Sequence, residues 1–301
     1  MKKIIVTGAT SMIGVDVIEE AIKNNIQVLA IVRNECNKLD RLPNSNLVKI
    51  IKCDLENLCQ IPFEAQYDVF YHFAWRGTNK IERTNVIVQA KNISDTIKAV
   101  QLAKRMKCRK FIGAGSQAEY GFVKDVISEN TKTDPVIAYG VAKLSAGKLA
   151  KCLCEQYGIS FVWGRIFSVY GRYDNEETMI NYALNNLLQG RDAHFSAATQ
   201  KWNYLNEHDA GKIFYLLGKY NNIKGIYCIA NEKSMRLKDY IEVIEKQVNS
   251  SAKCIYSGNS NDFSDVELQV DISKLKNDIS YNSFIPFIDG IQEIVRFKNR
   301  S

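Results

Sequence analysis

Strand and helix patterns alternate through the first half of the chain, and this alternation limits the folds open to it. Short β-branched runs predict strands at 3–7, 27–33, 47–51, 67–73, 109–114 and 160–167, and apolar periodicity predicts helices at 12–24, 84–106 and 139–157. Several of these strands are apolar throughout, as buried parallel strands are. The pattern therefore predicts an α/β fold, a doubly wound parallel sheet with helices on both faces.

The pattern is less regular after residue 172. Helices are predicted near 177–189, 209–219 and 287–297, and strands near 225–230 and 252–256. We predict a first domain over 1–172 and a smaller α/β domain over 173–301, with their segments interleaved. The second domain is expected to cap the sheet and to bind the substrate, because binding sites form at such junctions.

Composition and charge exclude several classes of function. The 301 residues carry a net charge of +7 without a dense basic run, which suits anionic small molecules and argues weakly for nucleic acid. Eight cysteines include no C-x-x-C pair and there are three histidines, so we expect no metal site. The sequence shows neither a signal peptide nor an apolar stretch of membrane length, which predicts a cytoplasmic, reduced protein that does not bind membranes.

A glycine-containing turn follows the first predicted strand. Gly8 permits a tight turn because it tolerates positive φ, and Gly14 lets the next helix pack close to the strand. Backbone N–H groups at the start of that helix attract phosphate. We predict a dinucleotide-binding turn, and the competing interpretation is an ordinary βα turn. The residues assigned to the cofactor here are Gly8, Thr10, Ser11, Met12, Ile13 and Gly14.

A Tyr-x-x-x-Lys pair opens the predicted helix 139–157. Its spacing places Tyr139 and Lys143 one turn apart on the same face. An ammonium beside a phenol favours the phenolate, so Tyr139 is a candidate proton donor and acceptor. Tyr120/Lys124 and Tyr220/Lys224 have the same spacing, but only Tyr139 begins a long helix. The alternative is an aromatic residue that only packs at a helix start.

Ser116 lies where the predicted strand 109–114 ends, in a Gly-rich segment. Catalytic groups of open α/β sheets gather at such strand ends. A serine hydroxyl there is suited to hydrogen-bond a substrate oxygen beside Tyr139, although a serine in an ordinary turn is the simpler interpretation.

The order of these motifs resembles the extended short-chain dehydrogenase/reductases, in the NAD-dependent epimerase/dehydratase family that acts on nucleotide sugars. The resemblance covers most of residues 1–220 and implies a Rossmann-type fold. It also implies that Ser116, Tyr139 and Lys143 form the catalytic set, that Lys143 bonds the nicotinamide ribose, and that Asn92 is structural. Further cofactor contacts implied by the resemblance are Asp54, Leu55, Phe73, Ala74 and Ile166. Relatives also suggest a homodimer formed through the helices 84–106 and 139–157.

Departures from the family pattern narrow the activity. Gln117 and Ala118 stand where dehydratases carry an Asp-Glu pair, so a dehydratase is not expected. Ser11 replaces the middle glycine of the first turn, where its hydroxyl is a candidate donor to the pyrophosphate. The substrate pocket is expected to differ as well, since Ser168 replaces an asparagine and Trp202 an arginine. We assign Trp75, Ser116, Gln117, Ser168 and Trp202 to the substrate, with Trp75 equally open to a packing role.

The end of the second predicted strand bears on the choice of cofactor. NAD-binding proteins commonly place an acidic residue there for the ribose 2′-hydroxyl. This chain has Val32 and Arg33, and a guanidinium suits a 2′-phosphate. We therefore expect NADP(H), with NAD(H) as the alternative if Arg33 stacks on adenine or faces solvent.

Together these features predict an NAD(P)H-dependent reductase of a nucleotide-linked 4-keto, 6-deoxy sugar, of the kind that completes deoxysugar donors for surface polysaccharides. Hydride passes from the nicotinamide to the keto carbon, with Tyr139 as the acid. The alternative is a nucleotide-sugar 4-epimerase that keeps NAD⁺ bound. A third hypothesis is a non-catalytic dinucleotide sensor or scaffold with the same fold, and Ser116, Tyr139 and Lys143 argue against it.

Overall fold

The computed structural model describes residues 1–63, 65–257 and 267–300. A seven-stranded sheet forms its centre, with the strand order β11-β6-β5-β4-β1-β2-β3 and parallel pairing throughout. Its strands are β1 (Lys3–Thr7), β2 (Gln27–Val32), β3 (Val48–Lys52), β4 (Val69–His72), β5 (Lys110–Ser116), β6 (Ser160–Ile166) and β11 (Gly225–Ile229). The strand order reverses between β1 and β4, where open α/β sheets place their ligands. The predicted doubly wound parallel sheet is confirmed.

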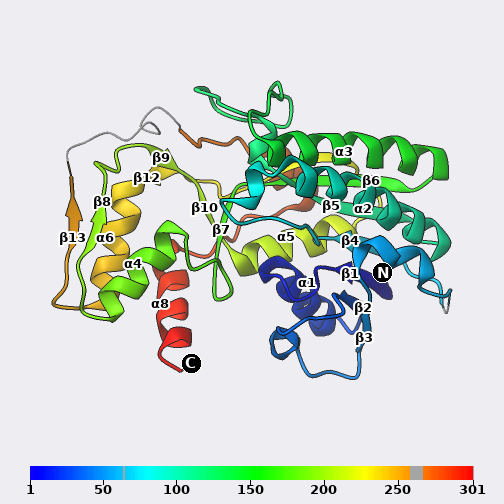
Figure 1. Ribbon diagram of the computed structural model, residues 1–301, viewed down its shortest axis with the longest axis horizontal. Coiled ribbons are helices and arrows are strands. Elements are labelled where there is room, and N and C mark those ends of the chain that lie inside the picture. The colour runs from blue at the N-terminus through cyan, green and yellow to red at the C-terminus, as the bar shows by residue number, and fades with distance from the viewer. Residues whose placement is uncertain (64, 258–266, 301) are drawn as a thin grey trace.

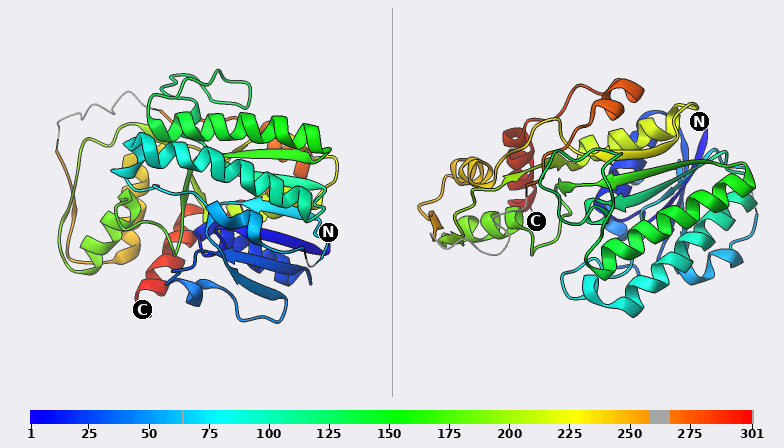
Figure 2. Two further views of the ribbon diagram at one scale, coloured as in Figure 1. Left: turned by 45° about the vertical axis from the view of Figure 1, so that its right-hand side comes forward. Right: turned by 90° about the horizontal axis from the view of Figure 1, so that it is seen from above.

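Helices cover both faces of the sheet (Figure 2). The helices α1 (Met12–Lys23) and α5 (Glu207–Lys219) pack against each other on one face, and α2 (Val86–Arg105) and α3 (Ala138–Tyr157) on the other. Capping residues mark the start of α2 and the end of α3. The Asn85 side chain accepts from the N–H groups of Ile87 and Val88 at the start of α2, and Gly158 ends α3 at φ +67°.

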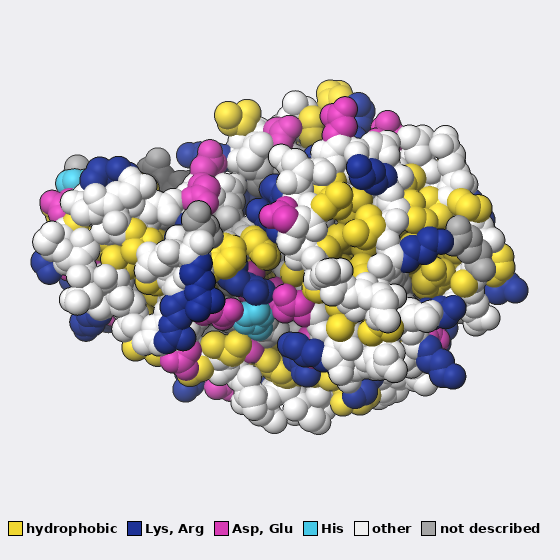
Figure 3. Space-filling model, turned by 90° about the horizontal axis from the view of Figure 1, so that it is seen from below, with side chains coloured by type: hydrophobic (Ala, Val, Ile, Leu, Met, Phe, Trp, Pro, Cys, Tyr) yellow, Lys and Arg dark blue, Asp and Glu magenta, His cyan; other side chains and the backbone are white. Residues whose placement is uncertain are grey.

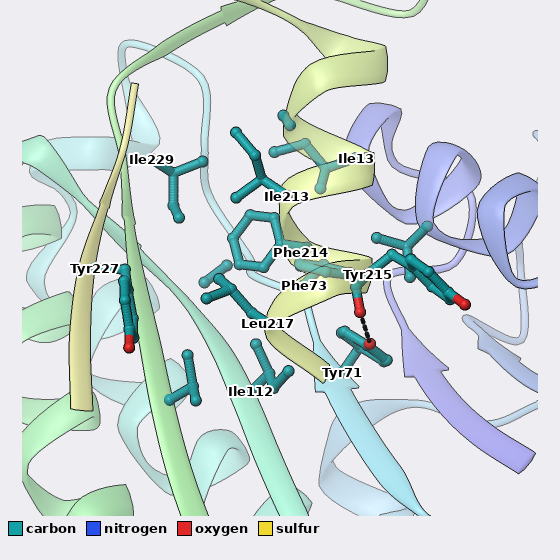
Figure 4. Close-up of a cluster of buried hydrophobic side chains, with 14 of the residues drawn as sticks. Ile13, Tyr71, Phe73, Ile112, Ile213, Phe214, Tyr215, Leu217, Tyr227 and Ile229 are labelled. Carbon is teal, nitrogen blue, oxygen red and sulfur yellow. Dashed lines mark hydrogen bonds between the residues drawn. The ribbon is translucent and has the colours of Figure 1, made fainter. Parts of the chain in front are cut away.

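The core beneath α5 is apolar and aromatic (Figure 4). Phe73 meets Phe214 edge to face at 5.0 Å between ring centroids. The Tyr71 hydroxyl lies on the same buried side and donates to the carbonyl of Tyr215 at 3.4 Å. Burial of such side chains contributes about 1.5–3 kcal/mol each, so this layer holds α5 firmly on the sheet.

The rest of the C-terminal part forms a smaller unit beside the sheet (Figure 1). Its helices are α4 (Met179–Leu188), α6 (Leu237–Val248) and α8 (Phe287–Lys298), which share one apolar cluster, while α7 (Ser273–Ile279) contacts α5 and β11. Three two-stranded pairs are formed by β7 (Ser168–Tyr170) with β10 (Tyr204–Asn206), β9 (Lys201–Trp202) with β12 (Met235–Arg236), and β8 (Ala193–Phe195) with β13 (Cys254–Tyr256).

Two segments after residue 172 belong with the first part of the chain. The strand β11 pairs with β6, and α5 packs on α1. The sequence predicts interleaved segments, and the division at residue 172 stays a prediction; residues 258–266 and 301 of the second predicted domain lie outside the described residues. Within the described residues, no helix has the length and apolar character needed to span a membrane.

Candidate functional site

Most residues predicted for the cofactor and the substrate lie near the carboxyl ends of the parallel strands, on the side of the sheet that faces the smaller unit (Figure 1). The turn after β1 lies against the end of β4. Gly8 has φ +67°, and a Cβ on it would come within 2.6 Å of the backbone nitrogen of Ala74. A Cβ on Gly14 would come within 2.3 Å of the Gly8 carbonyl oxygen. The physical reasons given for both glycines are therefore confirmed, and pyrophosphate binding at this turn stays a prediction.

The Ser11 hydroxyl acts within the turn itself. It donates to the Gly8 carbonyl at 2.7 Å and accepts from the Gly14 N–H at 3.2 Å, which makes Ser11 the N-cap of α1. The hydroxyl proton is directed to the Gly8 carbonyl here, and donation to a pyrophosphate stays a prediction. Thr10, Met12 and Ile13 occupy the same turn and the first positions of the helix.

The side of the site predicted for adenine is built from the ends of β2 and β3. Asp54 accepts from the Asn34 backbone N–H at 3.3 Å and from its side-chain amide at 2.7 Å. Leu55 is buried directly after it, while Arg33 is exposed. The residue that follows β2 is therefore Arg33 and not an acidic residue, and the Asp54 carboxylate after β3 is bonded to Asn34.

The structure brings the start of α3 against the end of β5. A Cβ on Gly140 would come within 2.3 Å of the Ala118 carbonyl oxygen, so the first turn of the helix packs directly on the turn that follows Ser116. Lys143 is buried and donates to the Ala114 carbonyl at 2.7 Å. These contacts place the segment carrying Ser116 and Gln117 next to the segment carrying Tyr139 and Lys143.

Burial changes the acid–base chemistry of Lys143. Removal from water disfavours the ammonium and lowers the pKa of Lys143 to about 7. Its Nζ lies 3.7 Å from the centroid of the Trp75 ring, whose face stabilises a cation. The lysine is therefore able to change its protonation state near neutral pH.

Trp75 packs beside Tyr139 and Lys143, and its assignment to the substrate stays a prediction. The two rings meet edge to face with centroids 6.1 Å apart, and the Trp75 N–H donates to Gln89 Oε1 at 2.9 Å. Arg83 lies over the Tyr139 ring, with its guanidinium carbon 4.2 Å from the ring centroid. Arg83 and Gln89 are not identified by the sequence reasoning, because neither belongs to a motif.

A buried carboxylate holds the Ser116 segment in place. Glu119 accepts from the Ser116 backbone N–H at 2.9 Å, from the Trp163 indole at 2.9 Å and from Arg165 Nε at 2.8 Å. The Ser116 hydroxyl accepts from the Ala118 N–H at 3.2 Å, and its own proton has no acceptor among the described residues. Glu119 is thus turned into the protein, whereas the Ser116 hydroxyl proton is available to a ligand.

Ser168 and Trp202, the two residues that differ from the family pattern in the predicted substrate pocket, are hydrogen-bonded to each other. The Trp202 indole N–H donates to the Ser168 hydroxyl at 2.8 Å, which joins β9 to β7. Ile166 ends β6, two residues before Ser168. Asn92 exchanges hydrogen bonds with the backbone of Arg76, which agrees with its expected structural role. The Tyr120 hydroxyl, in contrast, is buried against Cys228 Sγ at 3.3 Å, so Tyr120 is a core residue.

A cluster of charged side chains joins α1, α5 and α8. The Arg172 guanidinium contacts Glu207 at 2.6 Å and Asp16 at 3.5 Å, and His208 bonds Asp16 and Glu293. Burial works against the imidazolium, but the two carboxylates raise the pKa of His208 to about 10. Figure 3 shows charges of both signs gathered along the middle of one face of the molecule. Because Arg172 and protonated His208 already neutralise carboxylates here, we interpret the cluster as a structural link between the two parts.

Comparison with known proteins identifies relatives over the whole chain. The family model described as "NAD dependent epimerase/dehydratase family" matches residues 4–230. A CDP-abequose synthase from Salmonella muenchen is 25% identical over 85% of this chain and 84% of its own length. An uncharacterised UDP-glucose epimerase from Bacillus subtilis is 24% identical over 98% of this chain and 97% of its own length.

Solved structures share the fold. A UDP-N-acetylglucosamine 4-epimerase from Methanobrevibacter ruminantium M1, in complex with UDP-N-acetylmuramic acid, superposes with a TM-score of 0.89 at 23% identity, covering 99% of this chain and 98% of that one. A UDP-glucuronic acid 4-epimerase from Bacillus cereus, in complex with NAD, superposes with a TM-score of 0.83 at 22% identity and covers 99% of both chains.

Proposed function

The chain belongs to the NAD-dependent epimerase/dehydratase family, and we propose that within it the protein is an NADPH-dependent reductase of a nucleotide-linked 4-keto, 6-deoxy sugar. The observation that carries the choice of a reductase is the residue that follows β2, which is Arg33 and not an acidic side chain. Similarity to the CDP-abequose synthase supports a reductase that completes a deoxysugar donor. A cytoplasmic location suits the eight free cysteines.

Each of the assigned groups would have its own role in this reaction. Bound NADPH would supply the hydride. Tyr139 would protonate the oxygen of the reacting carbon, and Ser116 would donate its unused hydroxyl proton to the same oxygen. Lys143 would orient the nicotinamide ribose and supply positive charge beside Tyr139. Gln117 and Ala118 follow Ser116 and provide neither the acid nor the base that a dehydratase needs.

The second candidate is a nucleotide-sugar 4-epimerase, favoured by the similarity to several 4-epimerases. It would use the same three residues and keep NAD⁺ bound between turnovers. Denaturing the purified protein and identifying any released dinucleotide by chromatography separates the two. An empty site that prefers NADPH supports the reductase, whereas stoichiometric NAD⁺ supports the epimerase.

Replacing Arg33 by Asp tests the cofactor preference. We expect Arg33→Asp to weaken NADPH binding by at least about 10- to 100-fold, because a charge-assisted hydrogen bond contributes about 1.5–3 kcal/mol, and to strengthen NADH binding, since the new carboxylate can accept from the ribose 2′-hydroxyl. Titration of nucleotide fluorescence measures both affinities. Lys38→Asp, at an exposed position in the same loop, is the matched control. Equal losses for the two cofactors would argue against a contact with the 2′-phosphate.

We also propose a homodimer that forms through α2 and α3. Large apolar side chains are exposed on these helices, namely Val86, Ile87, Val141 and Leu149 at 66%, 69%, 47% and 47%. Exposed apolar patches of this kind mark interfaces. Leu149→Arg is expected to produce a monomer in sedimentation velocity, while Ile288→Arg on α8, exposed at 42%, leaves the dimer intact. A wild-type monomer, or equal behaviour of the two variants, would contradict the proposal.

A further inference from the structure

Two arginines of the loop between β4 and α2 have different surroundings. Arg76 is paired, since its Nε contacts Asp95 at 3.1 Å and its terminal nitrogen contacts Glu56 at 3.4 Å. Arg83 forms no ion pair within the described residues, and its Nε is buried there without a hydrogen-bond partner. A buried guanidinium N–H without an acceptor is destabilising, and native structures leave few such groups unsatisfied.

The position of Arg83 is fixed by its neighbours. Its backbone N–H donates to the Asn79 carbonyl at 3.0 Å, and Gln89 holds the adjacent Glu82 carbonyl at 2.9 Å. The Glu82 carboxylate, the acidic group closest to Arg83 along the chain, accepts from the Asn79 amide at 2.7 Å. The loop therefore places the Arg83 guanidinium over Tyr139, while the Glu82 carboxylate is hydrogen-bonded to Asn79.

Positive charge predominates around the Tyr139 ring. Arg83 lies over one part of it, and Lys143 Nζ is 5.7 Å from its centroid. The buried carboxylate on this side, Glu119, already accepts three hydrogen bonds. A sugar oxygen placed against Tyr139 would lie beside a guanidinium that forms no ion pair among the described residues.

We propose that Arg83 is a substrate-contacting residue whose guanidinium donates hydrogen bonds to oxygen atoms of the sugar held against Tyr139. This rests on the proposed binding of nucleotide sugars at the site. The contact holds the reacting end of the substrate, since Arg83 covers the tyrosine assigned as the acid. Its fork of N–H donors favours a sugar that offers two neighbouring oxygens, such as a pair of substituents on adjacent carbons.

Binding measurements test this contact without requiring turnover. Wild-type protein, Arg83→Ala, Arg83→Lys and the exposed-loop control Lys80→Ala are titrated calorimetrically with UDP, UDP-glucose, UDP-glucuronic acid, CDP, CDP-glucose and the 4-keto, 6-deoxy forms of UDP-glucose and CDP-glucose. Arg83→Ala is expected to weaken the best-bound nucleotide sugar about 10- to 100-fold and to leave the matching diphosphate and NADPH within about twofold. Arg83→Lys should be intermediate because it keeps the charge and loses the fork. Lys80→Ala should match the wild type.

The outcomes separate the inference from the proposed function. If the wild type prefers a nucleotide sugar to its diphosphate and Arg83→Ala keeps that preference, Arg83 does not contact the sugar. Equal weakening of sugar and diphosphate would place the guanidinium on the diphosphate and overturn the inference. A wild type that binds no nucleotide sugar more tightly than its diphosphate would overturn the proposed function and this inference with it. Thermal unfolding of each variant verifies that the fold is retained.

Discussion

Replacing Tyr139 by Phe is expected to lower kcat by about 10²- to 10⁴-fold, because the variant keeps the ring and loses the proton that the reacting oxygen needs. The ring contacts with Trp75 and Arg83 do not involve the hydroxyl, so cofactor affinity should stay within a few fold of the wild type. Steady-state reduction of a nucleotide 4-keto sugar measures kcat, and fluorescence titration measures cofactor binding.

The chain provides a matched control for this substitution. Tyr220 has the same spacing to Lys224, is exposed at 38% and lies at the end of α5. Tyr220→Phe should have no effect on kcat, which shows that position in the fold gives the Tyr-x-x-x-Lys pair its role. If Tyr139→Phe retained the biological activity, the protein would be the non-catalytic sensor or scaffold considered as the third hypothesis.

Replacing Glu119 by Ala is expected to lower the free energy of unfolding by about 3–5 kcal/mol, the cost of leaving a buried charge without its partner. The side chains of Glu119 and Arg165 are exposed at 1% and 5%, and Arg165 Nε donates to the carboxylate at 2.8 Å. The variant would also leave the Trp163 indole and the Ser116 backbone N–H without their acceptor. Urea unfolding followed by circular dichroism measures the loss.

Two further variants show whether the buried charge is the cause. Glu56→Ala removes an exposed partner of Arg76, since the Glu56 side chain is exposed at 59%. This variant should change the free energy of unfolding by less than about 1 kcal/mol. Adding Arg165→Met to Glu119→Ala should recover part of the loss, since the unpaired charge is then gone. A Glu119→Ala protein as stable as the Glu56→Ala protein would contradict this account of the buried pair.

The parallel sheet and its functional edge could be predicted from the sequence, because their signals are local. Apolar runs mark β4 and β5, and the helix predicted at 139–157 differs by one residue from Ala138–Tyr157. Gly8 and Gly14 have the tight contacts that their positions in the turn indicate. Each of these features is specified by residues that are close together in the chain.

The parts that sequence reasoning does not predict depend on contacts between distant residues. The helix α6 (Leu237–Val248) buries Tyr240, Ile241 and Ile244, and it packs against α4 and α8. The hydrogen bond between Trp202 and Ser168 spans 34 positions of the chain. Arg83 lies in a loop without periodicity, so only the folded structure shows that its guanidinium covers Tyr139.

The central claim is net hydride transfer to a nucleotide sugar, and isotope transfer tests it most directly. The protein and NADPH carrying two deuterium atoms at the nicotinamide C4 are incubated with a panel of nucleotide-linked 4-keto, 6-deoxy sugars and, separately, with nucleotide-linked 4-hydroxy sugars. A reductase oxidises one NADPH for each sugar consumed and leaves one deuterium on the carbon that carried the keto group, as mass spectrometry and NMR would show. Interconversion of nucleotide 4-hydroxy sugars without deuterium uptake or net NADPH oxidation would contradict the claim and identify an epimerase.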